Sequence, residues 1–138
     1  MSVTPAIRDF LVEVEALVDA HQWPLLDRDA LTIGTGDASA LVRLPHASDH
    51  ARDVELEVDD HRVIVGYKPE RIEFTKRDEA LRFVEMLGDG RVVLVVHRGI
   101  VLTTMESYRD GLALPFRRSR IPLPRFRPRT ERHEFGFV

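Results

Sequence analysis

The hydrophobic residues near the start of the chain recur every three or four positions, with charged residues between them. They are Ile7, Phe10, Leu11, Val14, Leu17 and Val18. This period predicts an amphipathic helix of about four turns that ends near His21 and turns its apolar stripe toward a core. Thr4 suits the capping position, Pro5 suits the first helical position, and Trp23-Pro24 ends the helix.

The middle of the chain changes to a period of two. Apolar residues alternate with acidic ones over 53–58, and a second strand, rich in apolar residues, is predicted at 62–68 after the turn at 59–61. A third stretch, 71–75, comes after a proline-containing turn, and 38–44 predicts an earlier strand that Pro45 ends. Strands joined by such short links pair antiparallel, so this region predicts a β-meander.

A second amphipathic helix is predicted over 77–87, with Thr75 and Asp78 as alternative caps. The unbroken apolar run 92–96 then predicts a buried strand, and 100–105 is expected to pair with it. The predicted fold class is therefore α+β: an antiparallel β-sheet, a meander of about five to seven strands, packed by two amphipathic helices. At 138 residues the chain suits a single domain spanning 1–138.

The segment 111–132 is rich in proline and arginine, which predicts an extended conformation. Its apolar residues favour a position lying over the domain, because leaving them in water would be costly. The last residues, 134–138, are expected to form an edge strand.

Composition narrows the cellular setting. The chain has no cysteine, which excludes disulfides and thiolate zinc sites. Its N-terminus lacks the basic start and apolar run of a signal peptide, and no stretch approaches the roughly 18 apolar residues of a membrane span. We therefore expect a cytoplasmic protein that does not contact a membrane.

Charge is unevenly distributed. Residues 1–108 carry 12 basic and 20 acidic groups, whereas residues 109–138 carry 8 basic and 3 acidic groups. Two interpretations stay open: the basic segment folds back on the acidic body, or one of the two surfaces meets a charged partner.

Motifs for catalysis or cofactor binding were sought and not found. His46 and His50 have helical spacing but follow Pro45 and lack the glutamate of a zinc-protease motif. No serine lies in a nucleophile elbow, and the glycine pairs at 34–36 and 88–90 lack the phosphate-loop pattern. The sequence therefore predicts neither an enzyme nor a metal or cofactor site.

The acidic meander is the strongest candidate for a binding surface. Its residues would steer a basic partner protein, with Tyr67 as an anchor. The predicted partner-binding residues are Glu55, Glu57, Asp59, Asp60, Tyr67, Glu70 and Glu73. The alternative is a nucleic-acid-associated protein that uses the C-terminal arginines around Arg125-Phe126-Arg127.

The layout of the chain also resembles a known family. A charged meander is followed by Glu79-Ala80-Leu81-Arg82-Phe83-Val84-Glu85-Met86-Leu87-Gly88-Asp89, an Arg/Pro-rich segment and the short aromatic stretch Phe135-Gly136-Phe137. Over about residues 53–138 this is similar to small immunity proteins of actinobacterial polymorphic-toxin systems. The resemblance implies a cytoplasmic inhibitor, without catalysis of its own, that occludes the active site of a partner toxin such as one attacking a nucleotide cofactor.

Overall fold

The computed structural model describes residues 3–109, 115–125 and 127–138. The described elements are α1 (Pro5–His21), β1 (Thr32–Gly36), β2 (Ser39–Leu44), the 3-10 turn η1 (His50–Arg52), β3 (Val54–Asp59), β4 (Val63–Tyr67), β5 (Glu70–Phe74), α2 (Arg77–Gly88), β6 (Val92–Arg98), β7 (Thr103–Arg109), β8 (Arg117–Ile121) and β9 (Arg129–Glu134). This confirms the predicted α+β class with antiparallel sheets and two helices.

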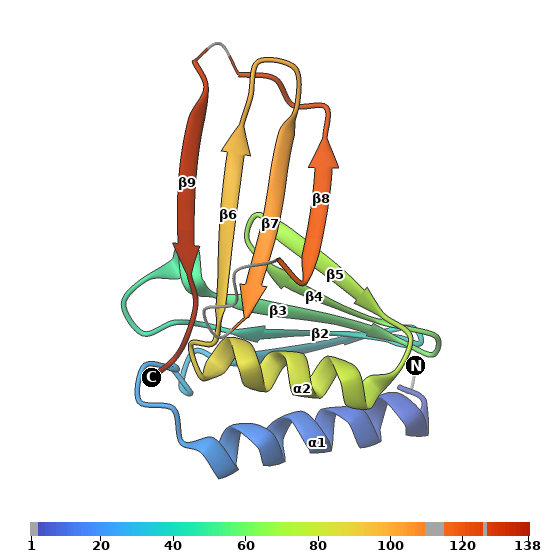
Figure 1. Ribbon diagram of the computed structural model, residues 1–138. Coiled ribbons are helices and arrows are strands. Elements are labelled where there is room, and N and C mark those ends of the chain that lie inside the picture. The colour runs from blue at the N-terminus through green and yellow to red at the C-terminus, as the bar shows by residue number, and fades with distance from the viewer. Residues whose placement is uncertain (1–2, 110–114, 126) are drawn as a thin grey trace.

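The first sheet is the predicted meander, with strand order β1-β2-β3-β4-β5 and every neighbouring pair antiparallel. Both helices lie against the same face of this sheet, so its other face is left without a covering helix (Figure 1). Alternation explains the packing, since every second residue of β2, β3 and β4 is apolar and points toward the helices, while Leu41 and Ile64 lie on the other face. These buried residues are Ala40, Val42, Leu44, Val54, Leu56, Val58, Val63, Val65 and Tyr67.

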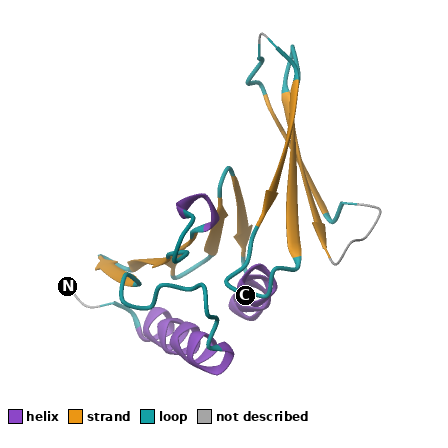
Figure 2. Cartoon of the chain, turned by 90° about the vertical axis from the view of Figure 1, so that its left-hand side faces the viewer, coloured by secondary structure: helices purple, strands orange, loops and turns teal. Residues whose placement is uncertain are grey.

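The remaining strands form a separate sheet with order β8-β7-β6-β9. The expectation of a single sheet is therefore wrong. The helix α2 separates β5 from β6, and β6 pairs with β7 and β9 instead of with β5. The second sheet rises steeply from the helix-backed one (Figure 2), and we call these four strands and their connections the arm.

Local signals account for α1 better than for α2. The Thr4 side chain accepts a hydrogen bond from the Ile7 amide, and Pro5 is the first helical residue, as predicted. Neither predicted cap serves α2, because Lys76 occupies the N-cap position without a side-chain hydrogen bond.

The C-terminal segment differs from its prediction. The strand at this end is β9, which stops at Glu134 and lies at the edge of the arm. Phe135 and Phe137 are buried instead, 4% and 1% exposed. The Phe137 amide donates to the Gly88 carbonyl at 2.8 Å, and its carbonyl accepts from the Leu25 amide at 2.7 Å. These hydrogen bonds join the end of the arm to the layer formed by α1 and α2. Phe135 and Phe137 belong to the same hydrophobic core cluster as the buried residues of both helices.

Candidate functional site

Four of the seven predicted binding residues lie on the uncovered face of the first sheet. Glu55, Glu57 and Asp59 project from β3 and Glu73 from β5, on the side opposite the buried positions. Strand register places Glu57 between Leu41 and Ile64 in one cross-strand row. These four acidic side chains therefore share one face of the sheet.

Arginines of the same sheet already pair with these acids. Arg43 lies 2.9 Å from Glu55, and Arg71 lies 2.9 Å from Glu57. Arg62 bridges two more carboxylates, at 3.3 Å from Asp59 and 2.9 Å from Glu73. The face is thus a lattice of exposed ion pairs and not a free acidic patch, and such pairs contribute only about 0–1 kcal/mol each.

Two pKa shifts follow from this lattice. Backbone hydrogen bonds, the largest from the His61 amide, lower the pKa of Asp59. The hydrogen bond to Glu73 raises the pKa of Arg62. Both shifts favour the charged forms of Asp59 and Arg62.

The other three predicted residues are not part of this face. Asp60 sits at the β3–β4 turn, where its carboxylate accepts a hydrogen bond from the Thr4 hydroxyl at 2.6 Å. Tyr67 and Glu70 are 0% and 5% exposed, so the prediction that they are surface contacts is wrong. Tyr67 lies on the inner side of β4, and Glu70 accepts a hydrogen bond from the Ser119 hydroxyl of the arm.

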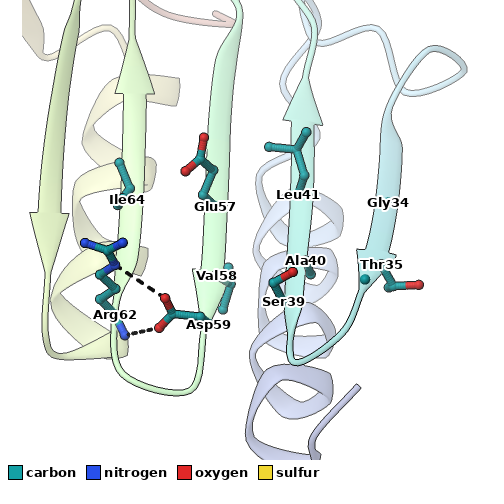
Figure 3. Close-up of a pocket in the computed structure, with 11 residues that line it drawn as sticks. Gly34, Thr35, Ser39, Ala40, Leu41, Glu57, Val58, Asp59, Arg62 and Ile64 are labelled. Atoms are coloured by element: carbon teal, nitrogen blue, oxygen red, sulfur yellow. Dashed lines mark hydrogen bonds and ion pairs between the residues drawn. The ribbon is translucent and has the colours of Figure 1, made fainter. Parts of the chain in front are cut away.

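A shallow hollow of about 410 Å³ lies on the uncovered face, over β1 to β4. Gly34 and Gly36 contribute no side chains to it, while Leu41 and Ile64 give it apolar walls. In Figure 3 the Asp59 carboxylate and Arg62 close one end of the row of side chains. The hollow is open, and its mixed lining does not define a particular ligand.

The arm meets the rest of the molecule through a small polar and aromatic contact. The hydroxyls of Tyr67 and Ser107 share a buried hydrogen bond of 2.8 Å. Arg117 of β8 lies 3.8 Å from Glu70, and the rings of Tyr67 and Phe135 meet edge to face at 5.3 Å. Burial raises the pKa of the Tyr67 hydroxyl, which therefore remains protonated and hydrogen-bonded.

The far end of the arm exposes aliphatic side chains. Ile100 and Val101, in the β6–β7 turn, are 68% and 78% exposed, and Leu123 is 56% exposed. The Thr103 hydroxyl donates to the Leu123 carbonyl at 2.6 Å, and the Arg125 amide donates to the Gly99 carbonyl at 2.9 Å. These bonds hold the turn and the segment after β8 together, so the three aliphatic side chains share one end of the arm, which we call the tip.

Arginines outnumber glutamates along the arm. The described residues of 92–138 include nine arginines and three glutamates. One of those glutamates, Glu131, contacts Arg98, Arg125 and Arg129 at 3.1 to 3.4 Å. Hydrogen bonding from Arg98 is the largest cause of the lowered pKa of Glu131. One carboxylate shared among several cations leaves this region strongly positive.

The Arg/Pro-rich segment agrees in part with each of the two interpretations of the charge pattern. Arg117 folds back and contacts Glu70. Most of the later arginines stay on the arm, and within the described part of the chain neither Arg120 nor Arg127 has an acidic partner. Phe126, the aromatic residue of the predicted nucleic-acid motif, lies outside the described residues.

The histidines considered for metal binding have structural explanations. The His46 ring is buried, and its Nδ1 accepts hydrogen bonds from the amides of Ser48 and Asp49. His50 begins the short turn η1 and its side chain is 90% exposed. The two rings therefore do not share one helix face.

Sequence reasoning missed the tip because it assigned Ile100 and Val101 to a paired strand. The available signal was the glycine at position 99, which places the following apolar residues in the turn between two strands. A turn that carries two adjacent aliphatic residues is unusual for a surface loop, because water is their only neighbour.

Comparison of the chain with protein-family models, with curated proteins and with solved structures found no match. Neither α1 nor α2 combines the length and the apolar character that crossing a membrane requires.

Proposed function

We propose that this chain is a protein-binding module that inhibits its partner by occlusion, with the tip of the arm as the docking surface. The observation that carries the proposal is the exposure of Ile100, Val101 and Leu123 at one end of a projecting sheet. Full burial of an aliphatic side chain contributes roughly 1.5–3 kcal/mol, so three such side chains supply a useful apolar centre for an interface.

The charge of the arm indicates the kind of partner. Arg120 and Arg127 have no acidic partner within the described residues, and the described residues of the arm include more arginines than glutamates. An acidic recess on another protein would satisfy these arginines and bury the aliphatic side chains at the same time. The proposed partner is therefore an acidic protein surface, the reverse of the basic cleft expected from the meander.

An inhibitory role agrees with the resemblance to small immunity proteins. A narrow sheet that projects from a helix-backed body has the shape of an element that enters a cleft, and occlusion needs no catalytic group on the inhibitor. The first candidate partner is the product of the gene directly upstream, which in the toxin-immunity case is the toxin itself.

The test compares a double aspartate variant of the tip with a single aspartate variant of α1. Binding of each variant to that purified product is measured. Ile100→Asp with Val101→Asp places negative charge and polar groups at the tip, whereas Val12→Asp changes a residue that is 60% exposed on α1. We expect the tip variant to bind at least about 30-fold more weakly, the loss typical of an interface centre, and the α1 variant to bind like the wild type. Equal binding by the tip variant would refute docking through the tip.

A charge-reversal variant of the meander separates the two possible surfaces. Changing Glu55, Glu57 and Asp60 to lysine should leave binding unchanged if the tip docks the partner. Loss of binding in this variant, with normal binding by the tip variant, would assign the interface to the meander instead.

Nucleic-acid binding is the second candidate, because the two unpaired arginines favour polyanions as well as acidic proteins. Fluorescence anisotropy with labelled single-stranded and duplex oligonucleotides at low ionic strength tests it directly. Salt-dependent binding that disappears in the Arg120→Gln, Arg127→Gln variant would favour this function, and its absence at low salt would remove it.

A further inference from the structure

The two helices end side by side, and their last turns bring three metal-binding side chains together. His21 is the final residue of α1, Glu85 lies in the last turn of α2, and Asp89 is its C-cap. The Nε2 atom of His21 is 3.1 Å from Glu85 Oε2, and its Nδ1 atom is 3.6 Å from Asp89 Oδ1. One donor atom from each of the three residues falls within 4.8 Å of the others.

The electrostatics of this corner favour a cation. The C-terminal end of a helix carries about half a negative charge, and two such ends meet here. Glu85 and Asp89, four residues apart on one helix face, add two carboxylates. Within the described part of the chain their ion pairs run only to His21, and no arginine or lysine pairs with either.

Trp23 holds the cluster in place. Its indole ring stacks on the His21 ring, with centroids 4.8 Å apart and planes 15° apart. The indole Nε1–H donates to Asp89 Oδ1 at 2.9 Å. Gly88 makes room for the ring, since a Cβ there would lie 2.2 Å from it. The imidazole and one carboxylate are thus oriented before any ligand arrives, as supporting residues orient metal ligands.

We propose that His21, Glu85 and Asp89 bind one divalent transition-metal ion, with zinc the best fit to one nitrogen and two carboxylate donors. Zinc ligands lie about 2.0–2.2 Å from the metal, so their donor atoms are about 3.4 Å apart. The donor atoms here lie within 4.8 Å of one another, so the widest pair reaches this spacing by closing at most about 1.4 Å. All three side chains are only partly buried, which allows the movement. Three protein ligands leave a fourth position for water. The ion neutralises the corner and ties the end of α1 to the end of α2.

Trp23 is the single tryptophan of the chain and lies against the cluster, so it reports on binding. Zinc is titrated into the full-length protein at about pH 7.5 while tryptophan fluorescence is recorded, and a chelator is then added. We expect a saturable one-site change that the chelator reverses. Because zinc binds the neutral imidazole, the affinity should fall as the pH is lowered.

Matched variants make the test specific. Glu85→Gln removes one carboxylate with little change of shape, and His21→Gln removes the imidazole. Each should weaken zinc binding about tenfold or more, while Glu79→Gln, an exposed change in the first turn of the same helix, should not. Circular dichroism confirms that the variants are folded.

Three outcomes would overturn the proposal. One is the absence of a saturable response to zinc in the wild type. Another is wild-type affinity in the Glu85→Gln variant. The last is fluorescence that responds to pH but not to zinc, which would show that a protonated His21, and not a metal, balances the two carboxylates.

Discussion

The buried hydrogen bond between Tyr67 and Ser107 tests how firmly the arm is seated. Both residues are 0% exposed, and their hydroxyls lie 2.8 Å apart where β4 of the first sheet meets β7 of the arm. Tyr67→Phe keeps the ring contacts with Phe83 and Phe135 and removes only the hydroxyl. Ser107→Ala removes the other partner with almost no change of volume.

The expected loss of unfolding free energy depends on which hydroxyl each variant leaves without a hydrogen-bond partner. Either single variant strands one buried hydroxyl without a partner, which costs roughly 1–3 kcal/mol of unfolding free energy. The double variant leaves neither hydroxyl, so its cost should be well below the sum of the two. We therefore expect a coupling energy of about 1–3 kcal/mol in the double-mutant cycle.

Urea unfolding, followed by the fluorescence of Trp23 and by circular dichroism, measures the four free energies. The matched control is Tyr108→Phe, because the Tyr108 hydroxyl bonds Glu106 at 2.7 Å on a half-exposed side of the arm. That change should cost no more than about 0.5 kcal/mol. Additive effects of the two buried changes, within about 0.5 kcal/mol, would refute a direct bond between the sheets.

Three further changes test other parts of the fold. Gly88→Ala drives a Cβ into the Trp23 ring and should lower stability by about 1–3 kcal/mol, measured by urea unfolding; an unchanged midpoint would contradict the close approach. Glu131→Gln removes a carboxylate whose pKa is lowered chiefly by Arg98. Its stabilising effect is full above the unfolded pKa of about 4.5 and is lost as pH falls through the lowered folded value, so thermal melts of variant and wild type should differ near pH 7 and converge as the pH falls through that lowered value. Thr4→Ala removes the N-cap of α1 and should cost about 1 kcal/mol, seen as a lower melting temperature; melting at the wild-type temperature would show that Pro5 alone suffices.

Local signals in the sequence were enough to predict α1 and the meander. The cap at Thr4, the proline at position 5 and the apolar period all act within α1, and the observed helix spans Pro5–His21 as predicted. Strand alternation likewise placed Glu55 and Glu57 on the uncovered face. These features depend on neighbours in the chain, which a sequence displays directly.

Features that depend on pairing between distant residues were not predicted. The ion pair of Arg43 with Glu55 arises because strand register places them opposite each other. The separation into two sheets depends on whether β6 pairs with β5 or with β7 and β9. The apolar pattern of 92–96 is the same in both cases. The cluster of His21, Glu85 and Asp89 joins residues more than 60 positions apart.

Tyr67 is different, because the sequence did hold the signal. Tyr67 follows Val63 and Val65 at steps of two residues along β4, and both valines are fully buried. Because side chains alternate between the two faces of a strand, the Tyr67 side chain points inward with them. Glu70 follows the same rule with Ile72 in β5. Tyr67 and Glu70 were assigned to the binding surface from the chemistry of their side chains. Their positions in β4 and β5 place both side chains on the buried face instead.

The burial of Phe135 and Phe137 bears on how the protein is made. Trp23 packs against Phe137 at 5.6 Å between ring centroids, and the backbone of Phe137 bridges residues 25 and 88. The layer formed by α1 and α2 thus lacks the packing contacts of Phe137 until the ribosome has added that residue. The final packing of α1 therefore requires a residue that lies more than 100 positions later in the chain.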